Sequence, residues 1–97
     1  MRTYVVLFNW TDQGIRNVAS VPDRAQRGAD LAAELGGRQV QLYFTLGGYD
    51  VVGLYEMPDD EAMTRFALET ARHGNTRTTI LKAFPREEFV RLVQSLG

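Results

Sequence analysis

The stretch Leu46-Gly47-Gly48-Tyr49-Asp50-Val51 decides the fold, because it reverses the chain between two strand-like runs. Residues 40–46 and 49–56 on either side are rich in β-branched, aromatic and leucine side chains. Glycine reaches positive φ without steric cost, and a Gly-Gly pair between two such runs is typical of a tight hairpin. We therefore predict an antiparallel hairpin at the centre of the chain.

A strand and a helix are predicted on each side of this hairpin. Residues 3–10 and 75–84 are strand-like, and apolar residues follow Pro22 and Pro58-Asp59-Asp60-Glu61 at helical spacing. Proline and acidic residues favour the first helical turn, since proline lacks an amide that is unpaired there and acids interact well with the helix dipole. Thr11 is predicted to cap a short helical turn just after the first strand.

The end of the chain predicts one more helix, which begins at Pro85-Arg86-Glu87-Glu88. Its apolar stripe consists of Phe89, Leu92, Val93 and Leu96. A stripe of this kind is normally buried against another element.

The order βαββαβ plus a C-terminal helix predicts an α+β, ferredoxin-like domain with an antiparallel sheet of strand order 4-1-3-2. The chain of 97 residues is expected to form a single domain, 1–97. Right-handed connections place both long helices on the same face of this sheet. The opposite face has no helix of its own to cover it, unless the last helix folds back over it.

The first strand is apolar on both faces, which indicates that a second copy covers the bare one. We therefore predict a homodimer or a multiple of dimers. The predicted interface consists of Tyr4, Val6, Phe8, Trp10, Tyr43 and Val51.

Composition narrows the classes of function. The absence of cysteine excludes disulfides, thiolate nucleophiles and cysteine-ligated metals, and one histidine alone makes no specific metal site. A net charge of −1 with interspersed charges argues against nucleic acid as a partner. No stretch is long and apolar enough for a signal or a membrane span, so a cytoplasmic protein without membrane contact is expected. No phosphate-binding loop is visible, and we expect neither a metal nor a cofactor.

Polar and aromatic residues gather at one edge of the predicted sheet, where four strand ends meet. An aromatic pocket with a few convergent polar groups is typical of a small-ligand site. The predicted ligand-binding residues are Trp10, Thr45, Tyr49, Asp50, His73 and Arg77, with His73 and Asp50 as candidates for catalysis.

These residues also have structural interpretations. Asp50 is suited to accept backbone N–H groups at a turn, and His73 to act as a cation at a helix end. Trp10 and Tyr49 are also suited to a subunit interface. Arg77 either pairs with Asp50 or holds a ligand carboxylate.

Four segments resemble the GYD-domain family of small bacterial and archaeal proteins: Gly48-Tyr49-Asp50 itself and residues 10–17, 58–62 and 74–79. The resemblance covers nearly the whole chain. It implies a ferredoxin-like fold in the dimeric α+β barrel group, but no agreed activity. The hairpin is also similar to that of the effector-binding domains of feast/famine transcription regulators, and shared folds do not carry function.

Two classes of function remain, and the sequence does not decide whether the protein is an enzyme. The first is a homo-oligomeric binding or regulatory module that holds a small organic ligand in a cleft at a subunit contact. The second is a cofactor-free isomerase, cyclase or monooxygenase that uses His73 or Asp50 for proton transfer. A structural oligomer without a ligand is the third interpretation.

Overall fold

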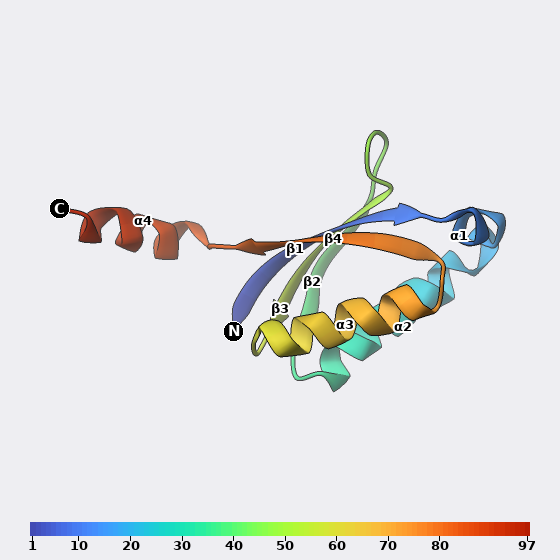
Figure 1. The fold of residues 1–97 in the computed structure, drawn as a ribbon, viewed down its shortest axis with the longest axis horizontal. Helices are drawn as coiled ribbons and strands as arrows, with labels where there is room; N and C mark the ends of the chain where they lie inside the picture. Colours follow the sequence, from blue (N-terminus) through green and yellow to red (C-terminus); the bar gives the residue numbers. More distant parts are fainter.

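The computed structural model describes residues 1–97 as an α+β domain with one antiparallel sheet (Figure 1). The strand order β2-β3-β1-β4 is the predicted order, viewed from the other edge. The central strand β1 is paired antiparallel with both β3 and β4. The strands are β1 (Arg2–Trp10), β2 (Arg38–Phe44), β3 (Val51–Met57) and β4 (Thr76–Ala83).

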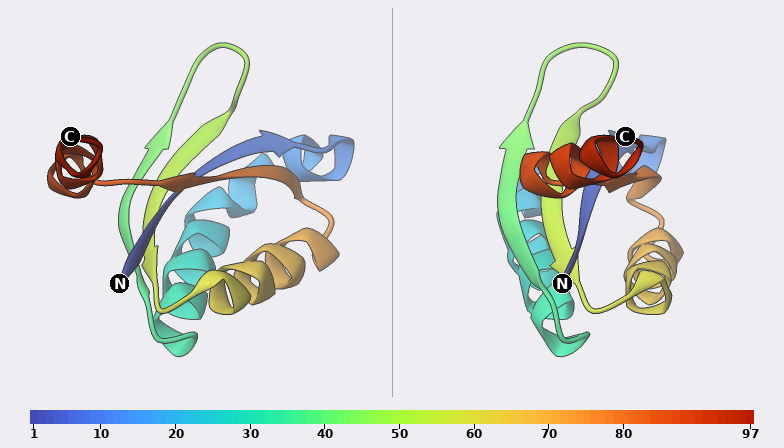
Figure 2. Two further views of the ribbon diagram at one scale, coloured as in Figure 1. Left: turned by 60° about the vertical axis from the view of Figure 1, so that its left-hand side comes forward. Right: turned by 90° about the vertical axis from the view of Figure 1, so that its left-hand side faces the viewer.

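The helices begin where proline, threonine and aspartate predicted them. They are α1 (Asp12–Arg16), the 3₁₀ turn η1 (Val18–Ser20), α2 (Val21–Glu34), α3 (Asp60–Arg72) and α4 (Arg86–Ser95). The Thr11 hydroxyl caps α1 by accepting from the Gly14 amide at 3.1 Å, and the Asp59 carboxylate caps α3 by accepting from the Ala62 amide at 2.8 Å. Figures 1 and 2 show α2 and α3 on the same face of the sheet, as predicted.

The central hairpin has a longer loop than the sequence suggested. β2 ends at Phe44 and β3 begins at Val51, so the predicted strand ends at 46 and 49 are wrong. One more hydrogen bond crosses the hairpin beyond these strand ends, from the Thr45 amide to the Asp50 carbonyl at 2.9 Å, and the Asp50 amide donates to the Phe8 carbonyl of β1, also at 2.9 Å. Gly47 has φ 123°, which confirms the positive φ expected in this glycine pair.

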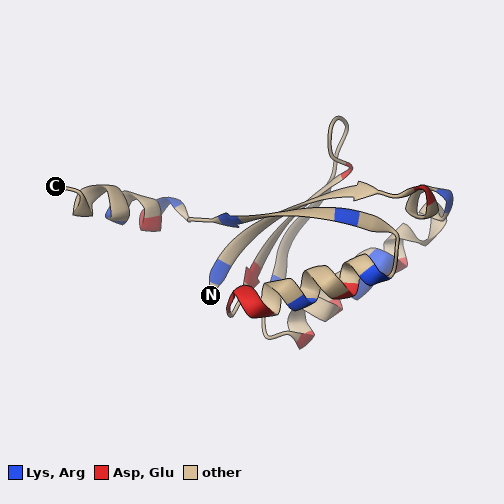
Figure 3. Ribbon diagram, in the orientation of Figure 1, with Lys and Arg blue, Asp and Glu red and all other residues tan.

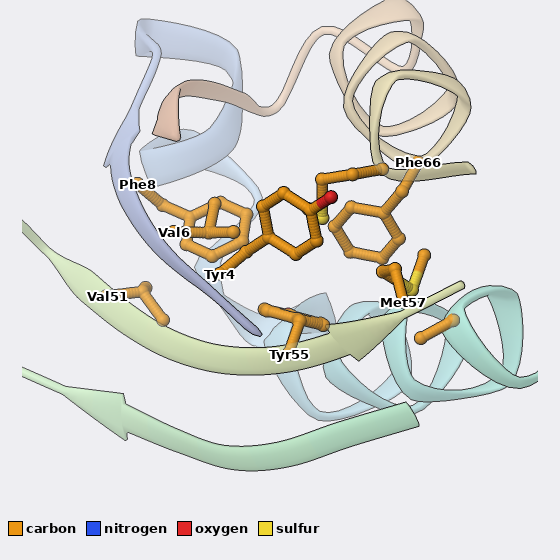
Figure 4. Packing of buried hydrophobic residues seen from close by; sticks show 9 residues of the cluster. Tyr4, Val6, Phe8, Val51, Tyr55, Met57 and Phe66 are labelled. Carbon is orange, nitrogen blue, oxygen red and sulfur yellow. The ribbon is translucent and has the colours of Figure 1, made fainter. Parts of the chain in front are cut away.

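The hydrophobic core lies between the sheet and the two long helices (Figure 4). Alternate residues of β1 and β3 point into it, as the period of a strand requires. From α3, the Phe66 ring lies 4.8 Å from the Tyr55 ring, centroid to centroid. The buried cluster consists of Tyr4, Val6, Phe8, Ala32, Val51, Tyr55, Met57, Met63 and Phe66.

This core corrects the predicted subunit interface. Tyr4, Val6, Phe8 and Val51 are at most 6% exposed within a single chain, and Trp10 lies against them. They face α2 and α3, so the prediction that put them on the bare face is wrong. Of the predicted set only Tyr43 is exposed, at 55%.

The strand residues that alternate with the core residues point to the other side of the sheet. They form an uncovered surface, which we call the open face. Register places Val5 of β1 beside Leu54 of β3 and Leu81 of β4, and Leu7 beside Val52. Helices α2 and α3 lie on the other face of the sheet, and no helix lies over this one (Figure 2). The open face consists of Val5, Leu7, Val52, Leu54, Tyr43 and Leu81, with Arg77 and Glu56 near its ends.

Helix α4 projects away from the domain instead of folding back over the open face (Figure 1). Pro85 before it is extended, with φ −55° and ψ 152°. Phe89, Leu92, Val93 and Leu96 are 48–83% exposed, so the stripe has no partner within the chain. The radius of gyration of 14.7 Å accordingly exceeds the roughly 12.5 Å of a compact domain of this length. None of the helices has the length and apolar character that a membrane crossing needs.

Candidate functional site

The hairpin loop is fixed to the end of β1 by polar contacts, which we call the hairpin corner. The Trp10 backbone amide donates to the Asp50 carboxylate, N···Oδ2 2.9 Å. The Thr45 hydroxyl donates to the Tyr49 carbonyl at 2.6 Å, and the Asn9 side-chain amide donates to the Gly48 carbonyl at 3.0 Å. Asp50 therefore has the role of a turn acid, which was one of its two interpretations.

Two further predicted residues make no hydrogen bond within this corner. His73 is the C-cap of α3, its Nε2 lies 3.7 Å from the Glu69 carboxylate, and its carbonyl accepts from the Gln13 side-chain amide at 2.9 Å. Arg77 stands opposite Asn9 in the β1–β4 ladder, on the side of the open face. Arg77 forms no ion pair, so the predicted pairing with Asp50 is absent.

A cavity of about 360 Å³ lies elsewhere, between the helix-covered side of the sheet and helices α2 and α3. Of the predicted ligand-binding residues, Trp10 and His73 line it, whereas Thr45, Tyr49, Asp50 and Arg77 do not. Its apolar wall combines aromatic and aliphatic side chains and includes Trp10, Leu31, Leu42, Phe44, Tyr55 and Phe66. The structure thus separates the predicted site into a hairpin corner and a cavity.

Arg24 of α2 is the most unusual polar residue of the cavity. Its Nη2 donates to the Gly14 carbonyl at 3.1 Å, while its Nε and Nη1 atoms are buried and have no hydrogen-bond partner. Desolvation, with a smaller contribution from the nearby charge of Arg27, lowers the pKa of Arg24. The guanidinium remains charged at neutral pH, because arginine side chains keep their proton in proteins.

Gln39 and Tyr55 add two polar groups from neighbouring strands of the same wall. The Gln39 Nε2 atom is buried without a partner. Burial raises the pKa of the Tyr55 hydroxyl to about 12, against a smaller opposing effect of the Gln39 amide, which lies beside that hydroxyl without forming a hydrogen bond of normal geometry. The cavity therefore presents unpaired N–H donors and a neutral hydroxyl at neutral pH.

Another polar cluster lies at the far end of β1, near the start of α3. The Tyr4 hydroxyl donates to one oxygen of Asp60, and the Lys82 ammonium donates to the other at 3.1 Å. Burial and then Asp60 raise the pKa of Tyr4 to about 12, while the hydrogen bonds from Tyr4 and Lys82 lower the pKa of Asp60. All three partners are paired, so this cluster joins the helix to the sheet.

The sequence interpretation missed Arg24, although its spacing carried a signal. Arg24, Gly28, Leu31 and Leu35 follow one another at intervals of four, three and four residues, which puts them on one face of α2. A charged residue on the core-facing stripe of a helix is uncommon, because burial of an unpaired charge is costly. Elsewhere, charges of both signs are spread over α2 and α3 (Figure 3).

The sequence family follows from a comparison with known domains. The model of the GYD domain matches residues 4–93 of the 97 in the chain. The chain belongs to the GYD-domain family. The three residues of the family's name, Gly48, Tyr49 and Asp50, lie in the hairpin corner of this GYD domain. They do not line its cavity.

Solved structures share the fold of this GYD domain. TTHA0845 from Thermus thermophilus is 26% identical with a TM-score of 0.54, covering 89% of this chain and 100% of that one. FFRP-DM1 is 20% identical with a TM-score of 0.56, covering 87% of this chain and 100% of that one. At that identity, the likeness to FFRP-DM1 shows the fold alone. The comparison with curated proteins finds no match.

Proposed function

We propose that this GYD domain is a homo-oligomeric module that binds a small organic ligand in the cavity between its sheet and helices. The observation that carries the proposal is the cavity itself, about 360 Å³ with aromatic walls and buried N–H groups without partners. Sites for small organic ligands have this form, with volumes of about 300–1,000 Å³ and a few orienting polar groups. We place the ligand within each subunit, whereas the sequence suggested a subunit contact.

Gly28 offers a direct test of the cavity. It lines the cavity from the middle of α2, and a Cβ atom added there has no neighbour within 4 Å. Gly28→Leu should fill the space and remove a helix-interior glycine, which itself costs about 0.5–1 kcal/mol relative to alanine. We therefore expect this variant to melt at a higher temperature and to lose ligand binding.

The measurement is a search for bound compounds by native mass spectrometry, after the protein is incubated with a small-molecule extract of cells. Wild type should retain a compound, Gly28→Leu should not, and Gly28→Ala should retain it because a methyl group leaves most of the space open. Ligand binding to the folded state should also raise the melting temperature of wild type. Retention by Gly28→Leu, or by neither protein, contradicts the proposal.

The homo-oligomeric part of the proposal rests on two exposed apolar surfaces, the open face and the stripe of α4. A second copy would cover the open face, as in a dimeric assembly of ferredoxin-like domains in the α+β barrel group. Leu7→Glu on the open face should give folded monomers. Phe8→Glu, one residue further along β1, should unfold the chain because Phe8 is only 6% exposed.

Light scattering together with circular dichroism separates these outcomes. A wild-type mass equal to that of one chain at micromolar concentration contradicts the homo-oligomer. An unchanged oligomeric mass for Leu7→Glu shows that the subunit contact lies elsewhere on the molecule.

A second candidate function is cofactor-free proton-transfer catalysis, favoured by one observation. His73 lines the cavity with its Nε2 3.7 Å from the Glu69 carboxylate. Asp50 is the weaker candidate because its carboxylate is engaged by the Trp10 amide outside the cavity. Turnover of the retained compound that His73→Gln abolishes, with binding intact, would support the enzyme; binding without turnover supports the binding module.

A further inference from the structure

The cavity contains a cation that the chain does not neutralise. Arg24 forms no ion pair with any carboxylate of the protein. One nitrogen is anchored to the Gly14 carbonyl at 3.1 Å and contacts the Asn17 carbonyl at 3.4 Å, which orients the guanidinium. Its other nitrogens are buried without acceptors. Arg24 is half-buried as a whole, but these two nitrogens are shielded from solvent, so an anion that pairs with them would be favoured.

Gln39 lies in another part of the cavity. Its buried Nε2 atom belongs to β2, which follows the C-terminal end of α2, whereas Arg24 lies in the first turn of that helix. The unpaired nitrogens of Arg24 by themselves call for a ligand group with several lone pairs. A carboxylate has two oxygens that accept about four hydrogen bonds and also carries the missing charge.

The acidic residues of the cavity do not supply this acceptor. Asp30 accepts from the Gln26 side chain at 3.0 Å, and the Glu69 carboxylate lies 3.5 Å from Arg72 Nε and 3.7 Å from His73 Nε2. Asp30 also lies six residues beyond Arg24 on α2, about 9 Å along the axis at about 1.5 Å per residue. Glu34 lies further still along the same helix. The part of the cavity around Arg24 is therefore positive.

We propose that the ligand is a small aromatic or aliphatic carboxylate, held at its charged end by Arg24 and along its apolar body by the aromatic wall that includes Trp10. This inference rests on the proposed function, because it names the chemistry of the ligand in the same cavity. A volume of about 360 Å³ is near the lower end of the usual range, so it suits a compound with one or two rings.

The molecule carries its own probe for this test. Trp10 is the only tryptophan and lines the cavity, so its fluorescence reports binding there. We would titrate the full chain with phenylacetate and with phenylacetamide, which share a shape but differ in charge. Wild type should bind phenylacetate at least about tenfold more tightly, as hydrogen bonds to a charged group are stronger.

The variants connect this preference to Arg24. Arg24→Gln should lose the preference for phenylacetate, and Arg24→Lys, which retains the charge without the planar donors, should keep part of it. Arg91→Gln is the matched control, since Arg91 is exposed on α4, away from the cavity, and it should behave as wild type. Circular dichroism establishes that each variant is folded, and Arg24→Lys provides the test if Arg24→Gln is not.

Each result distinguishes this inference from the proposed function. Equal binding of both probes by wild type, or a preference unchanged in both Arg24 variants, overturns the carboxylate but leaves the cavity as a ligand site. If neither probe binds while wild type, but not Gly28→Leu, retains a compound from the extract, the carboxylate inference alone fails. If nothing binds in either experiment, both fail.

Discussion

The hairpin corner and the cavity are both polar regions near the end of β1, but they differ in how their polar atoms are paired. In the hairpin corner the Asp50 carboxylate, the Thr45 hydroxyl and the Asn9 amide all find backbone partners within 3.0 Å. In the cavity, nitrogens of Arg24 and Gln39 are buried and find none. Paired groups stabilise the fold they belong to, whereas unpaired groups cost stability until a ligand pairs them. The contacts of the first region stabilise the fold, and the second region holds the unpaired donors on which the proposed function rests.

The largest effect on stability is expected at the hairpin corner. Asp50→Ala leaves the Trp10 amide without its charged acceptor and should cost about 1.5–3 kcal/mol of unfolding free energy. Urea denaturation measures this loss. Asp23→Ala, at an exposed acid in the first turn of α2, is the control and should change stability by less than about 1 kcal/mol. A stable Asp50→Ala protein that no longer binds ligand would reverse the assignment of the two regions.

Gly47 tests the loop of the same corner through a matched pair. A Cβ added at Gly47 or at Gly48 meets nothing within 4 Å, but only Gly47 has a positive φ, of 123°. Gly47→Val should therefore cost about 1–3 kcal/mol through backbone strain, and Gly48→Val distinctly less. Equal melting temperatures for the two variants would mean that the loop adopts another conformation.

Gln39 tests the cavity, where polar atoms are unpaired. Its replacement is expected to raise stability, whereas the changes at the hairpin corner lower it. Gln39→Leu removes a buried amide that lacks an acceptor, so it should raise stability by about 1 kcal/mol. The same variant should bind phenylacetate as wild type does, because Gln39 lies beyond the C-terminal end of α2 and Arg24 in its first turn. Gln41→Leu, at an exposed residue of the same strand, is the control. A loss of stability in Gln39→Leu would show that its amide is paired in solution.

The smallest effect is expected at the Tyr4–Asp60–Lys82 cluster and depends on pH. The hydrogen bonds from Tyr4 and Lys82 lower the pKa of Asp60 from 3.8, so its contribution to stability is present above that pH and is lost as pH falls through the lowered value. In Asp60→Asn, the free energy of unfolding should fall less steeply as pH is lowered between about pH 6 and pH 2, as measured by urea denaturation. The pKa of Tyr4, raised from 10.0 to about 12, adds stability that is lost only as pH rises toward 12. If Asp60→Asn loses as much stability at low pH as wild type does, other carboxylates cause that loss.

Much of the fold followed from local signals in the sequence. Prolines, caps and glycines marked the helices, and the order of elements then left one sheet topology. The sequence did not show which alternate residues of β1 lie in the core, because Val5 and Leu7 are as apolar as Val6 and Phe8. Strand β3 held the missing information, since its pairing puts the charged Glu56 beside Thr3 and therefore on the open face.

The site was less predictable because it depends on contacts between distant segments. Strand ends placed Trp10, Asp50 and Arg77 near one edge, but local sequence does not show which face each side chain occupies. Nor does it show that the Asp50 carboxylate meets the Trp10 amide across the sheet. Arg24 was overlooked because α2 has a thin, alanine-rich stripe, on which one arginine resembles a surface residue.

The direction of helix α4 is encoded in the backbone that precedes it. The residue before a proline avoids the helical region, and Pro85 itself is extended, so the connection from β4 behaves as a short stiff spacer. A stiff spacer has few conformations to lose when the helix meets a neighbour, which lowers the entropic cost of that encounter. Helix α4 therefore projects from the domain in a defined direction. Its exposed leucines and phenylalanine are accessible to other molecules without a prior rearrangement of the connection.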